Sequence, residues 1–95
     1  MMEKMTMAQL GALLDEKEVA VLDVRDREDF APRHFEGSLN IPEPELADRL
    51  DQLDVNTVYH VVCTKGIRAE RASALLQKQG YQVVQIVDGW ATYER

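Results

Sequence analysis

Apolar residues recur at helical spacing near the start of the chain and then form a continuous run. The leucines of residues 10–14 share one helical face, and Thr6 with Gln9 has the pattern of a capping box. This spacing predicts a helix over residues 6–16. Residues 19–24 are almost uninterruptedly apolar and rich in β-branched side chains. Such a run predicts a strand covered on both faces, as in a parallel sheet.

The remaining chain repeats this alternation of strand and helix. Apolar runs predict strands at residues 38–41, 57–62 and 83–87, and helical spacing predicts helices at residues 44–53, 67–79 and 88–95, the last one short. Gly80 supplies the stop signal of the helix at residues 67–79. Strands that alternate with helices predict an α/β fold, with a central, mostly parallel sheet of about four or five strands flanked by helices.

Composition and charge indicate the class of protein, its cellular location and the partners to expect. The 95 residues are 45% hydrophobic and 29% charged, which is typical of one globular domain, and we assign residues 1–95 to it. No apolar run approaches the ~20 residues of a membrane span, and the first residues lack an apolar signal core. A net charge of −6 argues against nucleic-acid binding. We therefore expect a cytoplasmic domain with no nucleic-acid or membrane partner.

The one cysteine, Cys63, follows a predicted strand and precedes a predicted helix. Ligands of parallel α/β sheets bind at such positions. A single cysteine forms no internal disulfide, and no Cys and His cluster suggests zinc, so we expect a reducing compartment, no metal and no cofactor. The connecting loop and the first helical residue are Thr64, Lys65, Gly66, Ile67 and Arg68.

The charges of this loop favour an anion. Residues 1–56 carry a net charge of −8, whereas residues 57–95 carry +2. A helix N-terminus favours acidic side chains, yet Lys65 and Arg68 stand here. Two cations beside a positive dipole end repel each other unless an anion lies between them, and a Cys63 thiolate would be that anion. Gly66 allows a left-handed turn, so that consecutive amides can point at one centre.

Spacing separates the possible chemistries of Cys63. A thioredoxin-like site needs a second cysteine three positions further on, with two residues between, and the chain has none. A cysteine-dependent phosphatase loop places five residues between Cys and Arg, whereas four separate Cys63 from Arg68. The shorter ring is tight for a phosphoryl group but adequate for a sulfur atom attached to the cysteine. A phosphatase or arsenate reductase is therefore disfavoured.

The loop at residues 63–68 resembles the six-residue active-site loop of rhodanese-type sulfurtransferases. Three further stretches agree with that family in the right order. Residues 21–30 are similar to its amino-terminal signature, residues 33–42 to its Gly-His-Ile-Pro-Gly-Ala-x-Asn-Ile-Pro stretch, and residues 87–93 to its Gly-Gly-x-x-x-Trp. The chain departs from these patterns at Arg33, Ala69, Asp88 and Tyr93. The resemblance implies a three-layer rhodanese-like domain.

The resemblance also implies the chemistry. Cys63 would attack the sulfane sulfur of thiosulfate or a persulfide and then pass it, as a Cys63 persulfide, to cyanide or a thiol. The amides of residues 64–68 would stabilise the anionic sulfur, with Thr64, Gly66 and Ile67 forming the cradle, and Lys65 and Arg68 would hold the sulfonate. Two alternatives stay open, a persulfide carrier fed by a donor or acceptor protein and a non-catalytic interaction module.

Other polar residues receive mostly structural interpretations. Asp23 and Arg25 end a strand at the same edge as Cys63, where they either order the loop or form a surface ion pair. We expect His34 and His60 to make structural contacts. Trp90 is assigned to packing in the core or at its rim, and the acidic residues 26–29 and 43–54 to solvated faces.

Overall fold

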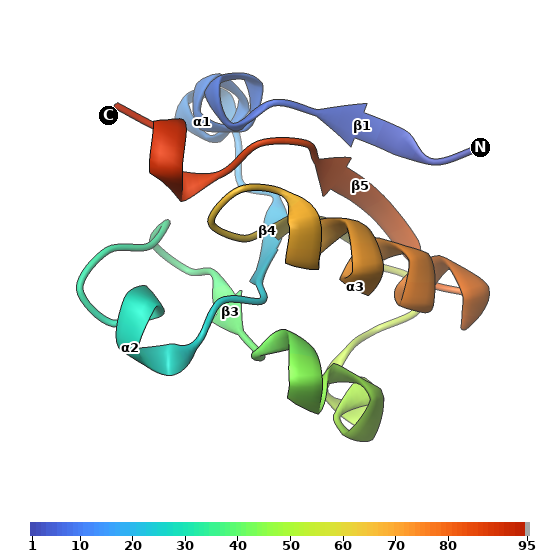
Figure 1. Ribbon diagram of the computed structural model, residues 1–95. Coiled ribbons are helices and arrows are strands. Elements are labelled where there is room, and N and C mark those ends of the chain that lie inside the picture. The colour runs from blue at the N-terminus through green and yellow to red at the C-terminus, as the bar shows by residue number, and fades with distance from the viewer. Residues whose placement is uncertain (95) are drawn as a thin grey trace.

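Five parallel strands form the centre of the computed structural model, which describes residues 1–94 (Figure 1). The strands are β1 (Glu3–Met5), β2 (Ala20–Asp23), β3 (Leu39–Asn40), β4 (Val58–Val62) and β5 (Gln82–Ile86). The helices are α1 (Met7–Glu16), α2 (Arg27–Phe30) and α3 (Ile67–Lys78), with three 3₁₀ helices, η1 (Glu43–Asp48), η2 (Leu50–Gln52) and η3 (Trp90–Thr92).

The sheet has the strand order β1-β5-β4-β2-β3, and every neighbouring pair is parallel. The α/β fold with a mostly parallel sheet is thereby confirmed. The central strand β4 pairs with β2 on one side, where Val21 lies opposite His60, and with β5 on the other, where Tyr59 lies opposite Val83. The apolar runs of β2, β4 and β5 are continuous because helices cover the sheet on both faces.

Two apolar cores lie on opposite faces of the sheet. Alternate residues of each strand point to opposite faces, so Leu22 and Val61 pack on the side of α3, whereas Val21 and Val62 pack on the side of α1. The capping box predicted at the start of α1 is present, with reciprocal bonds between Thr6 and Gln9. Figure 1 shows α1 and α3 on either side of the sheet.

The predicted helix at residues 44–53 is wrong. Two 3₁₀ helices occupy this segment, and their backbone bonds span three residues, as from Arg49 N–H to Leu46 O over 3.0 Å. Arg49, with φ −124° and ψ 22°, leaves helical geometry between η1 and η2, so no continuous α-helix spans the segment. The predicted apolar face of this segment still packs into the core, because Leu46 is fully buried under α3.

The short elements β1 and α2 were not predicted from the sequence. β1 has the sequence Glu-Lys-Met, and α2 has only four residues, so neither shows a periodic apolar pattern. At the other end of the chain, the expected helix at residues 88–95 is reduced to η3. Arg95 lies outside the described residues.

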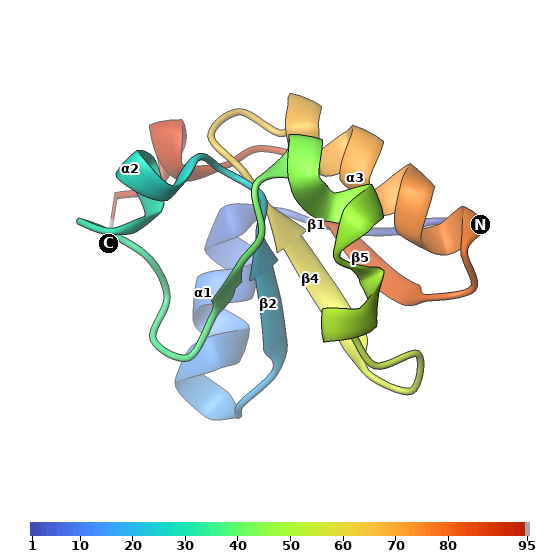
Figure 2. The same ribbon diagram turned by 90° about the horizontal axis from the view of Figure 1, so that it is seen from below.

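Because all strands are parallel, their carboxyl ends meet at one edge of the sheet. Figure 2 shows α2, the loop after β4 and the segment after β5 along this edge, at the top of the view. None of the helices within residues 1–94 combines the length and the apolar character needed to span a bilayer.

Candidate functional site

Cys63 directly follows β4 and lies beneath the first turn of α3. The residue is 1% exposed. Its Sγ atom accepts two amide hydrogen bonds among the described residues, from Gly66 N–H over 3.1 Å and from Ala69 N–H over 3.3 Å. Amides at a helix N-terminus carry partial positive charge and favour a negative sulfur. The sequence led us to expect such donors at residues 64–68, so Ala69 extends that range by one residue.

Gly66 sets the turn that aims these amides. Its φ of +97° lies in the left-handed region, as the sequence predicted for a turn after Cys63. A β-carbon at Gly66 would also lie 2.4 Å from the backbone oxygen of Val87, beyond the end of β5. Both the backbone angle and the space therefore require glycine at this position.

The segment after β5 fixes the other side of the loop. Trp90 N–H donates to Cys63 O over 3.1 Å, and Ala91 N–H donates to Thr64 O over 2.9 Å. A β-carbon at Gly89 would lie 2.2 Å from Cys63 O, so a side chain there would force the two segments apart. The position of Cys63 is thus held by a chain segment about 25 residues further along.

The loop lines a small pocket of about 240 Å³ that is bordered by Cys63, Thr64, Lys65, Ile67 and Arg68. Lys65 is exposed, whereas the Arg68 side chain is half-buried. The Arg68 guanidinium donates through Nη2 to Thr64 Oγ1 over 2.9 Å, and its Nη1 lies 3.8 Å from Asp26 Oδ1. This pocket brings together the cysteine and most of the loop residues singled out from the sequence.

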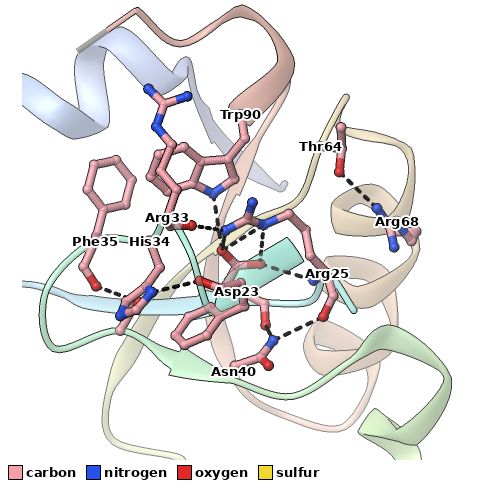
Figure 3. A network of polar contacts seen from close by, with 11 residues as sticks. Asp23, Arg25, Arg33, His34, Phe35, Asn40, Thr64, Arg68 and Trp90 are labelled. Carbon is pink, nitrogen blue, oxygen red and sulfur yellow. Dashed lines mark hydrogen bonds and ion pairs between the residues drawn. The ribbon is translucent and has the colours of Figure 1, made fainter. Parts of the chain in front are cut away.

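Asp23 and Arg25 form a buried ion pair beside the loop (Figure 3). The Asp23 carboxylate accepts bonds from the backbone N–H, Nε and Nη2 of Arg25 and from Nε1 of Trp90 over 3.1 Å. Asp23 is fully buried and Arg25 is 4% exposed, so the alternative of a surface ion pair is wrong. The backbone N–H of Trp90 donates to Cys63 O, so the ion pair supports the loop by holding the indole of the same residue.

The family of the chain follows from a comparison with known proteins. Residues 6–93 match the model of the rhodanese-like domain. The chain belongs to the rhodanese-like domain family. A crystal structure of a rhodanese-like domain protein from Staphylococcus aureus superimposes with a TM-score of 0.88, with 28% identity and coverage of 98% of this chain and 92% of that protein. The three-layer fold implied by the resemblance is thereby confirmed.

Curated relatives of this rhodanese-like chain carry several different names. The thiosulfate sulfurtransferase GlpE of Shewanella oneidensis is 33% identical to this chain, and the match covers 85% of this chain and 80% of GlpE. The putative sulfur carrier protein YrkF of Bacillus subtilis is 34% identical over 73% of this chain. The tRNA uridine(34) hydroxylase of Erwinia tasmaniensis is 34% identical over 86% of it. The chain spans 38% of the length of YrkF and 25% of the length of this hydroxylase.

Three departures from the rhodanese pattern make specific contacts in this member of the family. Asp88 Oδ1 accepts from Met7 N–H over 2.7 Å and so satisfies a free amide at the start of α1. The Arg33 guanidinium lies 4.9 Å above the Trp90 ring and donates to Tyr93 O over 2.9 Å. These contacts join the start of α1 and the loop around Arg33 to the segment that carries Trp90.

The structure gives further polar residues roles that the sequence did not distinguish. Trp90 packs in the core, as expected. It also links Asp23 to the Cys63 loop, because its indole N–H bonds to Asp23 and its backbone N–H bonds to Cys63 O. In the sequence, only the position of Trp90 in the last family-like stretch pointed to this linking role. Asp26 is exposed, as expected for a solvated face, and it also lies beside Arg68. His34 bonds through Nδ1 with Phe30 O over 2.7 Å, a structural contact as expected.

His60 likewise makes a structural contact, since its Nδ1 lies 3.0 Å from Ala20 O. A larger cavity, of about 650 Å³, lies near this end of β2, and it is bordered by residues that include Lys17, Ala20, Phe35 and Gly37. None of the loop residues borders it, and the parallel strands begin there rather than end. The smaller pocket at the Cys63 loop is the better candidate for the functional site, because a nucleophile and oriented amides lie there.

Proposed function

We propose that this chain transfers a sulfane sulfur through a persulfide on Cys63. The observation that carries the proposal is the pair of amides, from Gly66 and Ala69, that donate to Sγ inside a pocket bordered by two cationic side chains. An anion-favouring cradle around a sulfur nucleophile suits both a thiolate and a persulfide. The proposal includes a reducing, cytoplasmic setting, because the reaction needs Cys63 as a free thiolate and not as part of an intermolecular disulfide.

In the proposed reaction with thiosulfate, the Cys63 thiolate attacks the outer sulfur. A new S–S bond forms at Sγ, the S–S bond of thiosulfate breaks, and sulfite leaves with the electron pair. The terminal sulfur of the resulting persulfide carries the negative charge, which the amides of the loop stabilise. Lys65 and Arg68 attract the sulfonate oxygens of the donor, and Thr64, Gly66 and Ile67 shape the cradle.

Cyanide or a thiol then completes the cycle. The acceptor attacks the terminal sulfur, the S–S bond at Sγ breaks, and the electron pair returns to Cys63 as thiolate. Asp23 and Arg25 contribute as positioning residues, because they hold Trp90 and, through it, the backbone of Cys63. No metal or cofactor enters either displacement.

Thiocyanate production from thiosulfate and cyanide tests this proposal. The native chain is expected to form thiocyanate, and Cys63→Ala is expected to lose this activity entirely, since no other cysteine is present. Circular dichroism checks that the variant keeps its fold. Equal rates for the two proteins would refute the role of Cys63.

The similarity to the sulfur carrier YrkF favours a second candidate, in which another protein supplies the sulfur. The same Cys63 persulfide would form, but activity with thiosulfate would be poor. Intact mass spectrometry after mixing with a protein persulfide donor is then expected to show the gain of one sulfur atom, absent from Cys63→Ala. An unchanged mass would exclude the carrier role with that donor. The retained cysteine argues against a non-catalytic module.

A further inference from the structure

Asp26 places a negative charge at the rim of the Cys63 pocket. It directly precedes α2, where an aspartate side chain commonly caps the first amides of a helix. Within the described chain its carboxylate makes no such cap bond. Oδ1 instead lies 3.8 Å from Nη1 of Arg68, at the start of α3. Asp26 precedes α2 and Arg68 lies in the first turn of α3, and these two segments meet at the carboxyl edge of the sheet (Figure 2).

Arg68 is consequently engaged at both ends of its guanidinium. Nη2 donates to Thr64 Oγ1 over 2.9 Å, and Nη1 faces Asp26 (Figure 3 shows the bond to Thr64). An oxyanion gains most from arginine when it accepts two parallel bonds. An anion that approaches Cys63 therefore meets the field of the Asp26 carboxylate beside Arg68, and it finds one N–H group of the guanidinium already bonded to Thr64.

We propose that Asp26 determines the anion selectivity of the Cys63 pocket. This inference rests on the proposed sulfur transfer at Cys63. The carboxylate lowers the attraction of Arg68 for anionic donors, and the penalty grows with the charge of the donor. Dianionic thiosulfate loses most, whereas uncharged or singly charged persulfides lose little. The site is therefore biased towards persulfide donors of low charge, and Asp26 is its specificity-determining residue.

The test compares Asp26→Asn with Asp29→Asn. Both substitutions remove one negative charge near α2, but in residues 1–94 the acidic partner of Arg68 is Asp26. The first readout is alkylation of Cys63 by iodoacetate and by iodoacetamide, which differ in charge but displace the same iodide. Intact mass reports the reaction directly, because the chain has one cysteine. The iodoacetate-to-iodoacetamide rate ratio measures the electrostatic attraction without requiring any sulfur transfer.

Exposed ion pairs change rates and affinities by up to about fivefold. Asp26→Asn is expected to raise the alkylation ratio about twofold and to lower KM for thiosulfate by roughly two- to fivefold, with kcat less affected. Asp29→Asn is expected to change the alkylation ratio and KM for thiosulfate by a clearly smaller factor. The difference shrinks at high salt. In an Arg68→Gln background, Asp26→Asn is expected to change the alkylation ratio less, because only the direct field of the carboxylate on the anion remains.

An unchanged alkylation ratio in Asp26→Asn, or an equal change in Asp29→Asn, would overturn the selectivity role of Asp26. The two proposals fail separately. If no variant uses thiosulfate but the ratio responds to Asp26, thiosulfate is not the donor and the role of Asp26 stands. If thiocyanate forms and neither readout responds to Asp26, the sulfur transfer stands and the selectivity role is refuted.

Discussion

Replacing Gly66 with alanine adds two separate costs to the loop that carries Cys63. The first cost is conformational, because φ is +97° and a non-glycine residue in the left-handed region loses about 1–2 kcal/mol. The second is steric, since the new β-carbon would lie 2.4 Å from the backbone oxygen of Val87. Overpacking against atoms that cannot move aside typically costs a further ~1–3 kcal/mol.

Gly80 provides the matched control. Its φ is +91°, but a β-carbon there would meet nothing within 4 Å. Gly80→Ala therefore carries the conformational cost alone, about 1–2 kcal/mol. Gly66→Ala is expected to destabilise the chain by at least about 1 kcal/mol more than Gly80→Ala, which lowers Tm by a further ~4–8 °C in a domain of this size.

Urea unfolding followed by circular dichroism measures the free energy of unfolding of both variants. The alanine at position 66 should also displace the amide that donates to Cys63 Sγ, so we expect loss of sulfur transfer in Gly66→Ala but not in Gly80→Ala. Equal destabilisation of the two variants would show that the contact with Val87 costs nothing. The steric part of the reasoning would then be wrong.

Two further predictions concern charged contacts. The hydrogen bond from Arg27, helped by Arg49 and opposed by partial desolvation, lowers the pKa of Glu45 from 4.5 to about 2. A lowered pKa in the folded state stabilises the chain above pH 4.5, and this contribution disappears as the pH falls towards 2. In urea unfolding, the stability difference between the native chain and Glu45→Gln should therefore shrink on acidification; a constant difference would contradict it. Trp90→Phe removes the indole bond to buried Asp23, so we expect a loss of about 1.5–3 kcal/mol in urea unfolding, and a loss below 0.5 kcal/mol would contradict that bond's importance.

Local sequence determined the principal elements of the fold. The apolar runs of β2, β4 and β5 are buried on both faces, and α1 and α3 have enough turns to show a helical stripe. The order of these elements implied a parallel sheet, because successive parallel strands need a crossover between them. Two short elements escaped prediction, since β1 pairs with the distant strand β5 and α2 has too few residues to show a helical pattern.

The six residues from Cys63 to Arg68 are contiguous, so the sequence alone could single them out as one loop. Gly66 between a strand and a helix indicated the turn, and the spacing to Arg68 indicated a ring suited to sulfur. These inferences needed only short-range geometry, which the backbone of consecutive residues largely dictates.

Tertiary structure decided what surrounds that loop. Asp26 follows β2 and Trp90 follows β5, yet both reach the Cys63 loop because parallel strands bring their carboxyl ends to one edge. Whether Asp23 and Arg25 are a surface pair or a buried support depended on Trp90 covering them. The burial of Asp23 and the interaction of Asp26 with Arg68 arise only when these segments pack together. The local pattern of apolar and polar residues does not show which distant segments pack against each other.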